Sequence, residues 1–418
     1  MSAVRAHPVR WGVVGFGWVA RDYFAPAVRE AGDRLVAICD PGAVARAEAE
    51  RAGITSHSEL AAFLADPAVE AIYVATPNHL HRAAVEAAAA AGRPVLCEKP
   101  MAAQLADAEA MGAAVERSGI LYGTAFDQRH HPAHRTLRDL IAAGRLGTVT
   151  AVRIVYACWL DSRWSACAGQ ENWRIDQAKA GGGALIDLAP HGLDLVSFLL
   201  GEPLAQVAAL TQAKAQDYAV DDGAVLMARS ESGALAQLHV AYNCPDALPR
   251  RRLEVIGTKG LAVAVNTMGQ TAGGELTLIH ADDGRVESVP FSDASPFTEQ
   301  VRAFGDALRS GDRSGYSVAH DLHTMRLLDA AYRFAASPAE TRPPSPLEGE
   351  GGPRVSEGRE RGSAPSGAPG AADRPYAPFA SRAPDGATPL PAGSAGHPLP
   401  QEGEGLTRPA LSSHETTS

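Results

Sequence analysis

The stretch WGVVGFGWVA, residues 11–20, decides the fold of this 418-residue chain. An apolar run typical of a buried strand is followed directly by two closely spaced glycines and a segment that can open a helix. Gly15 permits a tight turn, Gly17 lets the backbone approach a pyrophosphate, and Ala20 is small enough for close packing of helix on strand. We therefore expect the start of this helix to bind a dinucleotide through its free N–H groups. The residues of this loop expected to contact the cofactor are Gly15, Phe16, Gly17, Trp18, Val19 and Ala20.

A carboxylate at the end of the next apolar run supports this interpretation. Asp40 follows LVAIC and lies 20 positions beyond Ala20, where it can accept hydrogen bonds from the adenosine ribose hydroxyls. Its negative charge would repel the additional phosphate of NADP, and no arginine directly follows it. The sequence therefore favours NAD over NADP, while the nearby Arg46 leaves NADP open.

Short apolar runs alternate with helical patterns as far as residue 126. The runs that indicate buried strands are WGVV, LVAIC, AIYVA, PVLC and ILYGTA. Strands alternating with helices are typical of a parallel sheet with helices on both faces. Residues 1–126 are thus predicted to form an α/β Rossmann domain that binds NAD(P), with its ligand beyond the carboxyl ends of the strands.

The pattern changes at residue 127. After the helical segment HRTLRDLIAAG come alternating segments joined by glycine turns, namely VTAVRIVYACW, GAVLMARS, ALAQLHVAY, RLEVIG and ELTLIH. We expect residues 127–337 to form an α+β domain for substrate binding and oligomerisation, with a large, mostly antiparallel open sheet closed by two helices. Residues 338–418 hold 15 of the 29 prolines and few large apolar side chains, which predicts a disordered tail.

Composition argues against several classes of partner. A formal net charge of −10 provides no basic field for phosphates, so we expect neither nucleic acid nor an anionic membrane to be bound. No apolar run approaches the roughly 20 residues that span a bilayer, and the N-terminus lacks a signal peptide's apolar stretch, which predicts a cytoplasmic location. The 5 cysteines are scattered without CxxC pairing, which favours reduced thiols over disulfides or zinc.

Two polar groupings carry the candidate chemistry. Lys99 follows the strand PVLC, and an ammonium at that position could stabilise the alkoxide that develops as hydride leaves a substrate carbon. The segment GGGALIDLAPHGLDL, residues 181–195, places Asp187 and His191 four positions apart, on one face of a helix. Histidine titrates near neutrality and can exchange the hydroxyl proton, while the three glycines would let the backbone pass close to a ligand. Pro190 predicts a kink or a late helix start, which would weaken this shared face.

Together these motifs resemble the Gfo/Idh/MocA family of NAD(P)-dependent sugar and polyol oxidoreductases over about residues 9–336. The matching pieces, in family order, are GFGWVA, the strand ending in Asp40, ATPNHLH at 75–81, CEKP at 97–100 and GGGALIDLAPHGLDL. The resemblance implies a Rossmann domain followed by an α/β domain whose open sheet serves in contacts between subunits, so a homodimer or homotetramer is expected. It also implies that Lys99, Asp187 and His191 are the catalytic residues.

The resemblance extends the site to further residues. It implies that the nicotinamide end of the cofactor site is formed by Thr76, Pro77, Asn78, His81, Glu98 and Lys99. The residues expected to bind substrate are Lys99, Gln128, Arg129, Trp173, Arg174, Asp187 and His191. Trp173 and Arg174 could stack on a sugar ring or clamp a carboxylate, but the tryptophan could equally pack at a domain or subunit contact. The histidines of QRHHPAHR have no acids or cysteines at ligand spacing, so no metal is expected.

The expected activity is hydride transfer between NAD and a secondary alcohol of a sugar, polyol or derivative. Lys99 would polarise the oxygen, His191 would exchange its proton, and Asp187 would position the substrate or orient the imidazole. Two alternatives stay open. One is an enzyme that cleaves or eliminates glycosides while recycling its NAD internally, and the other is a non-catalytic NAD-binding sensor or regulator.

Overall fold

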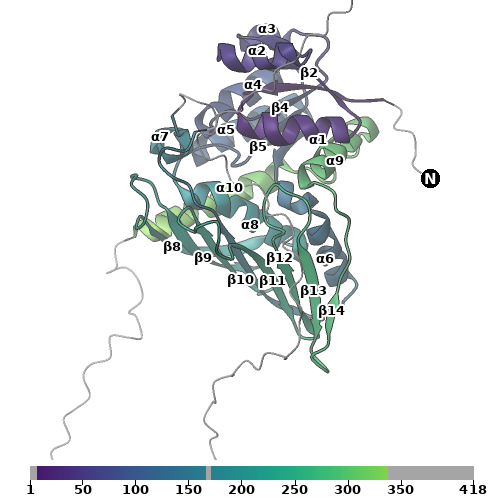
Figure 1. Cartoon of the computed structure of the whole chain (residues 1–418), viewed down its shortest axis with the longest axis vertical. Helices are drawn as coiled ribbons and strands as arrows, with labels where there is room; N and C mark the ends of the chain where they lie inside the picture. Colours follow the sequence, from purple (N-terminus) through teal and green to yellow (C-terminus); the bar gives the residue numbers. More distant parts are fainter. Residues whose placement is uncertain (1–6, 166–170, 338–418) are drawn as a thin grey trace, which may run out of the picture. The chain divides into compact units, whose positions relative to one another are not determined.

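The computed structural model describes residues 7–165 and 171–337, and these belong to one compact unit. Within them lie a six-stranded and an eight-stranded sheet (Figure 1). The predicted fold class is confirmed, because the first sheet is parallel and the second is mostly antiparallel. The predicted disordered tail over residues 338–418 lies outside the described residues.

The six-stranded sheet has the order β3-β2-β1-β4-β5-β6. Its strands are β1 Arg10–Val14, β2 Arg34–Cys39, β3 Thr55–His57, β4 Ala71–Val74, β5 Val95–Glu98 and β6 Tyr122–Ala125. Its helices are α1 Ala25–Glu30, α2 Ala43–Arg51, α3 Leu60–Leu64, α4 His81–Ala90 and α5 Leu105–Ser118, with a π-helical turn Ala20–Phe24 and a 3-10 turn Asn78–Leu80. All five predicted runs are strands. Strand β3 could not be predicted, since its residues TSH are too few and too polar to give an apolar pattern.

The eight-stranded sheet has the order β14-β13-β12-β11-β7-β10-β9-β8, in which only the pair β7 and β10 is parallel. Its strands are β7 Val149–Ala157, β8 Leu204–Gln212, β9 Gly223–Ser230, β10 Leu235–Ala241, β11 Arg251–Gly257, β12 Gly260–Val265, β13 Glu275–His280 and β14 Val286–Ser288. The remaining helices are α6 Pro132–Ala142, α7 Gln177–Ala180, α8 Ala184–Leu200, α9 Pro296–Ser310 and α10 Val318–Ala336, with 3-10 turns η3 Asp127–His130 and η4 Trp173–Ile175.

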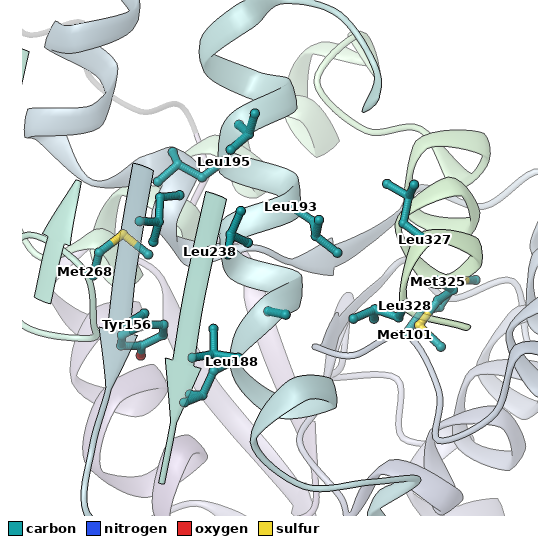
Figure 2. Packing of buried hydrophobic residues seen from close by; sticks show 14 of the residues in the cluster. Met101, Tyr156, Leu188, Leu193, Leu195, Leu238, Met268, Met325, Leu327 and Leu328 are labelled. Atoms are coloured by element: carbon teal, nitrogen blue, oxygen red, sulfur yellow. The ribbon is translucent and has the colours of Figure 1, made fainter. Parts of the chain in front are cut away.

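Helix α8 packs on the middle strands of the eight-stranded sheet. It packs on β7 and β10 on one side and on α6 and α10 on others, and Leu188, Leu193 and Leu195 take part in this packing (Figure 2). The segment Gln177–Leu200 reaches a mean hydropathy of 1.4, so by length and composition it could span a bilayer. The expectation that no segment is this apolar was therefore wrong. Since 83% of that window is buried inside the fold, its apolar character is that of a core helix.

Helix α9 packs against the first sheet's elements, although the sequence analysis assigned its residues to the second domain. Phe297, Val301 and Phe304 join the buried cluster around Trp11, and the rings of Trp11 and Phe304 are 5.4 Å apart. The helix also contacts α1 and the turn η3. It thereby holds Phe297 beside the cofactor-binding loop.

Candidate active site

One cavity opens where strands β4, β5 and β6 end, at the edge of the sheet where the sequence placed the ligand. The residues that line it and were predicted as site residues are Trp18, Val19, Thr76, Asn78, Glu98, Lys99, Trp173, Arg174, Asp187 and His191. The lining residues that the sequence analysis did not identify are Ala75, Asp127, Tyr156, Leu188, Gln270 and Phe297. The structure thus brings the CEKP lysine and the histidine of α8 to the same space, as predicted.

Lys99 and Asp187 form an ion pair in the cavity wall. The Nζ of Lys99 donates to Asp187 Oδ1 at 2.6 Å and to the Asp187 carbonyl oxygen at 3.0 Å. The hydroxyl of Tyr242 donates to the other carboxylate oxygen at 2.6 Å. Burial alone would raise the pKa of Asp187, but the charges of Lys99 and Arg174 and these hydrogen bonds hold the pKa well below its usual range. Asp187 is therefore an ionised anchor for the Lys99 ammonium.

His191 lies on the same helix, but its nearest carboxylate is Asp127 rather than Asp187. Its Nδ1 is 3.0 Å from Asp127 Oδ1. The ring of Tyr156 meets the imidazole edge to face, with 5.4 Å between centroids. This geometry therefore does not support the idea that Asp187 orients the imidazole of His191. Asp127 was missed because it stands alone after a strand, in no motif.

The start of α8 corrects the predicted role of the three glycines. A side chain at Gly181 would collide with the Ala103 carbonyl, one at Gly182 with the Tyr332 hydroxyl, and one at Gly183 with the Asp221 backbone. The glycines thus allow close approach of other parts of the protein, not of a ligand. Asp221 accepts from the N–H groups of Gly183 at 2.9 Å and Leu185 at 2.7 Å, which supplies the helix cap from a distant loop.

Pro190 does not interrupt α8, which runs unbroken over Ala184–Leu200. The prediction of a late start was wrong, since the helix begins before Asp187. Asp187 and His191 therefore keep their four-residue spacing on one helix and both line the cavity.

Arg174 is held by aromatic rings at one side of the cavity. Its guanidinium lies 4.5 Å from the ring centroid of Trp173, 4.9 Å from Trp164 and 6.0 Å from Trp18. Within the described ranges, no carboxylate forms an ion pair with it. Trp18 belongs to the glycine loop and Arg174 to the turn η4, so this cluster joins residues from the two parts of the chain that line the cavity.

The glycine loop fits a dinucleotide. Gly15 has φ +87° and lies so close to Ala75 that no side chain fits there, whereas a side chain at Gly17 would meet no described residue within 4 Å. This open space beside the helix start is what a pyrophosphate requires. Asp40 accepts from the N–H groups of Phe16 at 2.8 Å and Gly42 at 2.7 Å, which ties the loop to the end of β2. Phe16 itself and Ala20 pack in the core.

Polar side chains also line the part of the cavity wall next to the glycine loop. The hydroxyl of Thr76 is buried without a hydrogen-bond partner among the described residues. Asn78 donates to the Ala180 carbonyl at 2.9 Å, and Glu98 accepts from the buried Tyr73 hydroxyl. Burial raises the pKa of Glu98. Thr76 is the group of this wall best placed to gain a partner when a cofactor binds.

His81 and Pro77 do not line the cavity, although both were predicted to contact the cofactor. His81 is fully buried, with Nδ1 3.0 Å from the Pro100 carbonyl oxygen and Nε2 2.9 Å from that of Thr76. Burial lowers its pKa to about 4. His81 therefore links the loop after β4 to the Lys99–Pro100 segment, whose peptide bond is cis.

Gln128 and Arg129 lie outside the cavity, contrary to the predicted substrate contacts. Gln128 is fully buried and exchanges hydrogen bonds with the Gly269 backbone. Arg129 pairs with the buried Asp194 and lines a separate surface groove. Their side chains are thus used for packing between elements. No group of three or more potential metal ligands occurs in the described part of the chain.

Comparison with known proteins agrees with this arrangement. Residues 9–126 match the model of an oxidoreductase family with an NAD-binding Rossmann fold, and residues 134–263 match the GFO/IDH/MocA C-terminal domain. The chain is 34% identical over 330 residues to 1,5-anhydro-D-fructose reductase of Ensifer adhaerens, a match that covers 76% of this chain and 95% of that protein.

Two further proteins are similar over most of their length. D-xylose 1-dehydrogenase (NADP(+)) 2 of Haloferax volcanii is 30% identical, with 79% of this chain and 98% of that protein covered. The structure of a levoglucosan dehydrogenase in complex with NADH and levoglucosan superposes with a TM-score of 0.67 at 26% identity, over 79% of this chain and 98% of the other. With both domains matched and the motif residues gathered in one cavity, the chain belongs to the Gfo/Idh/MocA oxidoreductase family.

Proposed function

We propose that this chain is an NAD-dependent oxidoreductase that transfers hydride between nicotinamide and a secondary alcohol of a sugar, polyol or derivative. The observation that carries the proposal is that Lys99 and His191, from different domains, line one cavity with the ionised Asp187 beside them. A bound nicotinamide supplies the hydride acceptor or donor. The names of the relatives, which refer to sugars and an anhydrosugar, support this substrate class.

The polar groups of the cavity have spare hydrogen-bonding capacity for the substrate oxygen. An ammonium has three N–H donors, and the two acceptors provided by Asp187 leave one donor of Lys99 for a ligand. No described residue hydrogen-bonds Nε2 of His191, so this nitrogen is free to take the hydroxyl proton. Lys99 would stabilise the developing alkoxide while His191 exchanges the proton.

The preference for NAD is supported by the surroundings of Asp40. Its carboxylate lies at the end of β2, where a 2′-phosphate would meet a like charge. The guanidinium of Arg46 donates to the backbone carbonyls of Asp40 at 2.8 Å and Pro41 at 2.7 Å. Arg46, which had kept NADP binding possible, thus already donates to backbone carbonyls of the protein.

A substrate panel tests the proposal. Purified protein is incubated with NAD or NADP and a set of sugars, polyols, anhydrosugars and sugar acids, and NADH or NADPH is followed by absorbance. We expect turnover with at least one neutral sugar or polyol and a kcat/KM at least about tenfold higher with NAD, because of the Asp40 charge. Product formation without net NADH would indicate internal recycling. Cofactor binding without any turnover would indicate a sensor.

We also propose a homo-oligomer that forms through the open face of the second sheet. Leu210, Val225 and Met227 on β8 and β9 are exposed, and Met227 remains 64% accessible. Leu210 and Val225 are cross-strand partners, so their side chains lie on the same face. Apolar side chains grouped on one face are typical of protein contacts.

The change Met227→Glu places a charge in this face and should shift the protein to the monomer in light scattering coupled to gel filtration. The control is Val44→Glu on α2, an exposed apolar position away from this sheet, which should leave the mass unchanged. A wild-type protein that is monomeric at micromolar concentration would contradict the proposal.

A further inference from the structure

We infer that Asp127 is the positioning residue that fixes the ring and the tautomer of His191. The inference rests on the proposed role of His191 as the group that exchanges the hydroxyl proton. Asp127, just after the last strand of the Rossmann sheet, would thus act together with His191, which lies on α8.

The two residues come from different parts of the fold. Asp127 opens the turn η3 just after β6, and His191 lies in the middle of α8. The side chain of His191 is 5% exposed and that of Asp127 is 4% exposed. Both line the cavity, so the pair forms part of its wall at the meeting point of the two domains.

The facing atoms of this pair have no other partner among the residues that the structure describes. Nδ1 of His191 and Oδ1 of Asp127 are 3.0 Å apart, and neither atom makes a well-aligned hydrogen bond to any described residue. Leaving a buried donor or acceptor unpaired is energetically unfavourable. Each atom is therefore the available partner of the other. Hydrogen bonds of catalytic groups are often poorly aligned before the ligand binds and tighten in the complex.

This pairing selects one tautomer. If Nδ1 carried a lone pair, it would face a carboxylate oxygen, and two acceptors would meet without a proton between them. If Nδ1 carries the proton, it can donate to Asp127 and Nε2 becomes the acceptor. The form with a proton on Nδ1 is also the only neutral form that can take a substrate proton at Nε2.

The carboxylate is itself held in place. Oδ2 of Asp127 accepts from Gln128 Nε2 at 2.9 Å, and the same amide group donates to the Gly269 carbonyl at 2.9 Å. Gln128 also accepts from the Gly269 N–H at 3.2 Å. Gln128, which the resemblance had placed in the substrate site, thus supports Asp127 from behind.

The other ionisable groups around His191 are already engaged. On α8, Asp187 is bound by Lys99 and Tyr242, and Asp194 by Arg129 and His320. From β5, Glu98 accepts from Tyr73. From β7, Tyr156 packs edge to face on the ring. Among the described residues, Asp127 is the carboxylate within ion-pair distance of the imidazole.

During alcohol oxidation the pair would act as follows. The hydroxyl proton would move to Nε2 as the alcohol carbon is oxidised to a carbonyl, and a bound nicotinamide would supply the hydride acceptor. The ring then holds protons on both nitrogens and a positive charge, while the Nδ1 proton stays between ring and carboxylate. Asp127 stabilises this imidazolium without taking a proton, and reduction runs through the same states in reverse.

The test compares Asp127→Asn with wild type and with the control Asp321→Asn. Asp321 is a buried carboxylate that accepts from Thr124 and does not line the cavity. We expect Asp127→Asn to lower kcat about ten- to a hundredfold with KM changed less than about threefold, since orientation and imidazolium stabilisation are lost while the cavity keeps its shape. The acidic midpoint of the kcat/KM profile for oxidation should move to lower pH. Asp321→Asn should leave the profile in place.

A double variant and a measurement on the unaltered chain complete the test. In a His191→Asn background, Asp127→Asn should change kcat less than about twofold, because the coupled partner is absent. In wild-type protein, ¹⁵N spectra of labelled histidines, with the signal assigned through His191→Asn, should show the proton on Nδ1.

Three results would overturn the inference. They are an unchanged kcat and pH profile in folded Asp127→Asn, additive losses in the double variant, and a proton on Nε2 in the spectra. The spectra need no turnover and no folded Asp127 variant. If His191→Asn alone leaves activity intact, the proposed function of His191 fails instead, and the two failures are thereby distinguished.

Discussion

Lys99→Met should lower kcat on an identified sugar or polyol substrate about a hundredfold or more. Methionine keeps much of the length of the side chain but removes the donor that stabilises the developing alkoxide, and loss of one such donor typically costs about two to three orders of magnitude in kcat. Steady-state rates of NADH formation measure the effect. Binding of NAD, followed by quenching of tryptophan fluorescence, should change little, because the glycine loop and Asp40 do not depend on this ammonium.

The same change should also lower stability. Without the ammonium, the partly buried carboxylate of Asp187 keeps Tyr242 as a donor but loses its cation, and a largely desolvated charge without its partner is destabilising. The matched control is Lys179→Met. Lys179 pairs with Glu171 and Asp176 at the surface, where ion pairs contribute about 0–1 kcal/mol. If Lys99→Met kept a rate within about threefold of wild type, Lys99 could not be the group that polarises the oxygen.

The fold could be predicted from the sequence where periodicity and turn chemistry agree. The run WGVV, the glycines after it and Asp40 each follow from strand, loop and helix rules, and the structure has them as β1, the cofactor loop and the end of β2. The strands β8, β12 and β14 were missed. β8 has the sequence LAQVAALTQ. It is an edge strand with most of its residues accessible, so apolar and polar side chains alternate only weakly along it.

The candidate site could be predicted where residues belong to a contiguous motif. Lys99, Asp187 and His191 were found in this way, and all three line the cavity. Asp127 and Tyr156 were not, because their proximity to His191 arises from packing of α8 against the turn η3 and the strand β7 and leaves no trace in local spacing. The three glycines before α8, Gly181–Gly183, were singled out for the wrong reason. A glycine required by a protein contact looks the same in sequence as one required by a ligand.

His191→Asn should lower kcat for oxidation at neutral pH about a hundredfold or more, since asparagine can fill the space and hydrogen-bond but cannot take a proton. The size of the loss does not by itself identify the role, because a disturbed cavity also slows turnover. The role is identified by how the rates depend on pH. A single imidazole that serves as base in oxidation and as acid in reduction makes the two directions respond to pH in opposite ways.

In wild type, oxidation should therefore rise with pH, and reduction of the corresponding ketone should fall over the same range. In His191→Asn both of these pH-dependent steps should disappear, and oxidation should recover in part at high pH, where solvent more readily accepts the hydroxyl proton. Initial rates in both directions between pH 5 and 10 decide the matter. If the variant kept the opposing profiles, the proton would be handled by another group, and the convergence of His191 and Lys99 on one cavity would then serve binding rather than proton transfer.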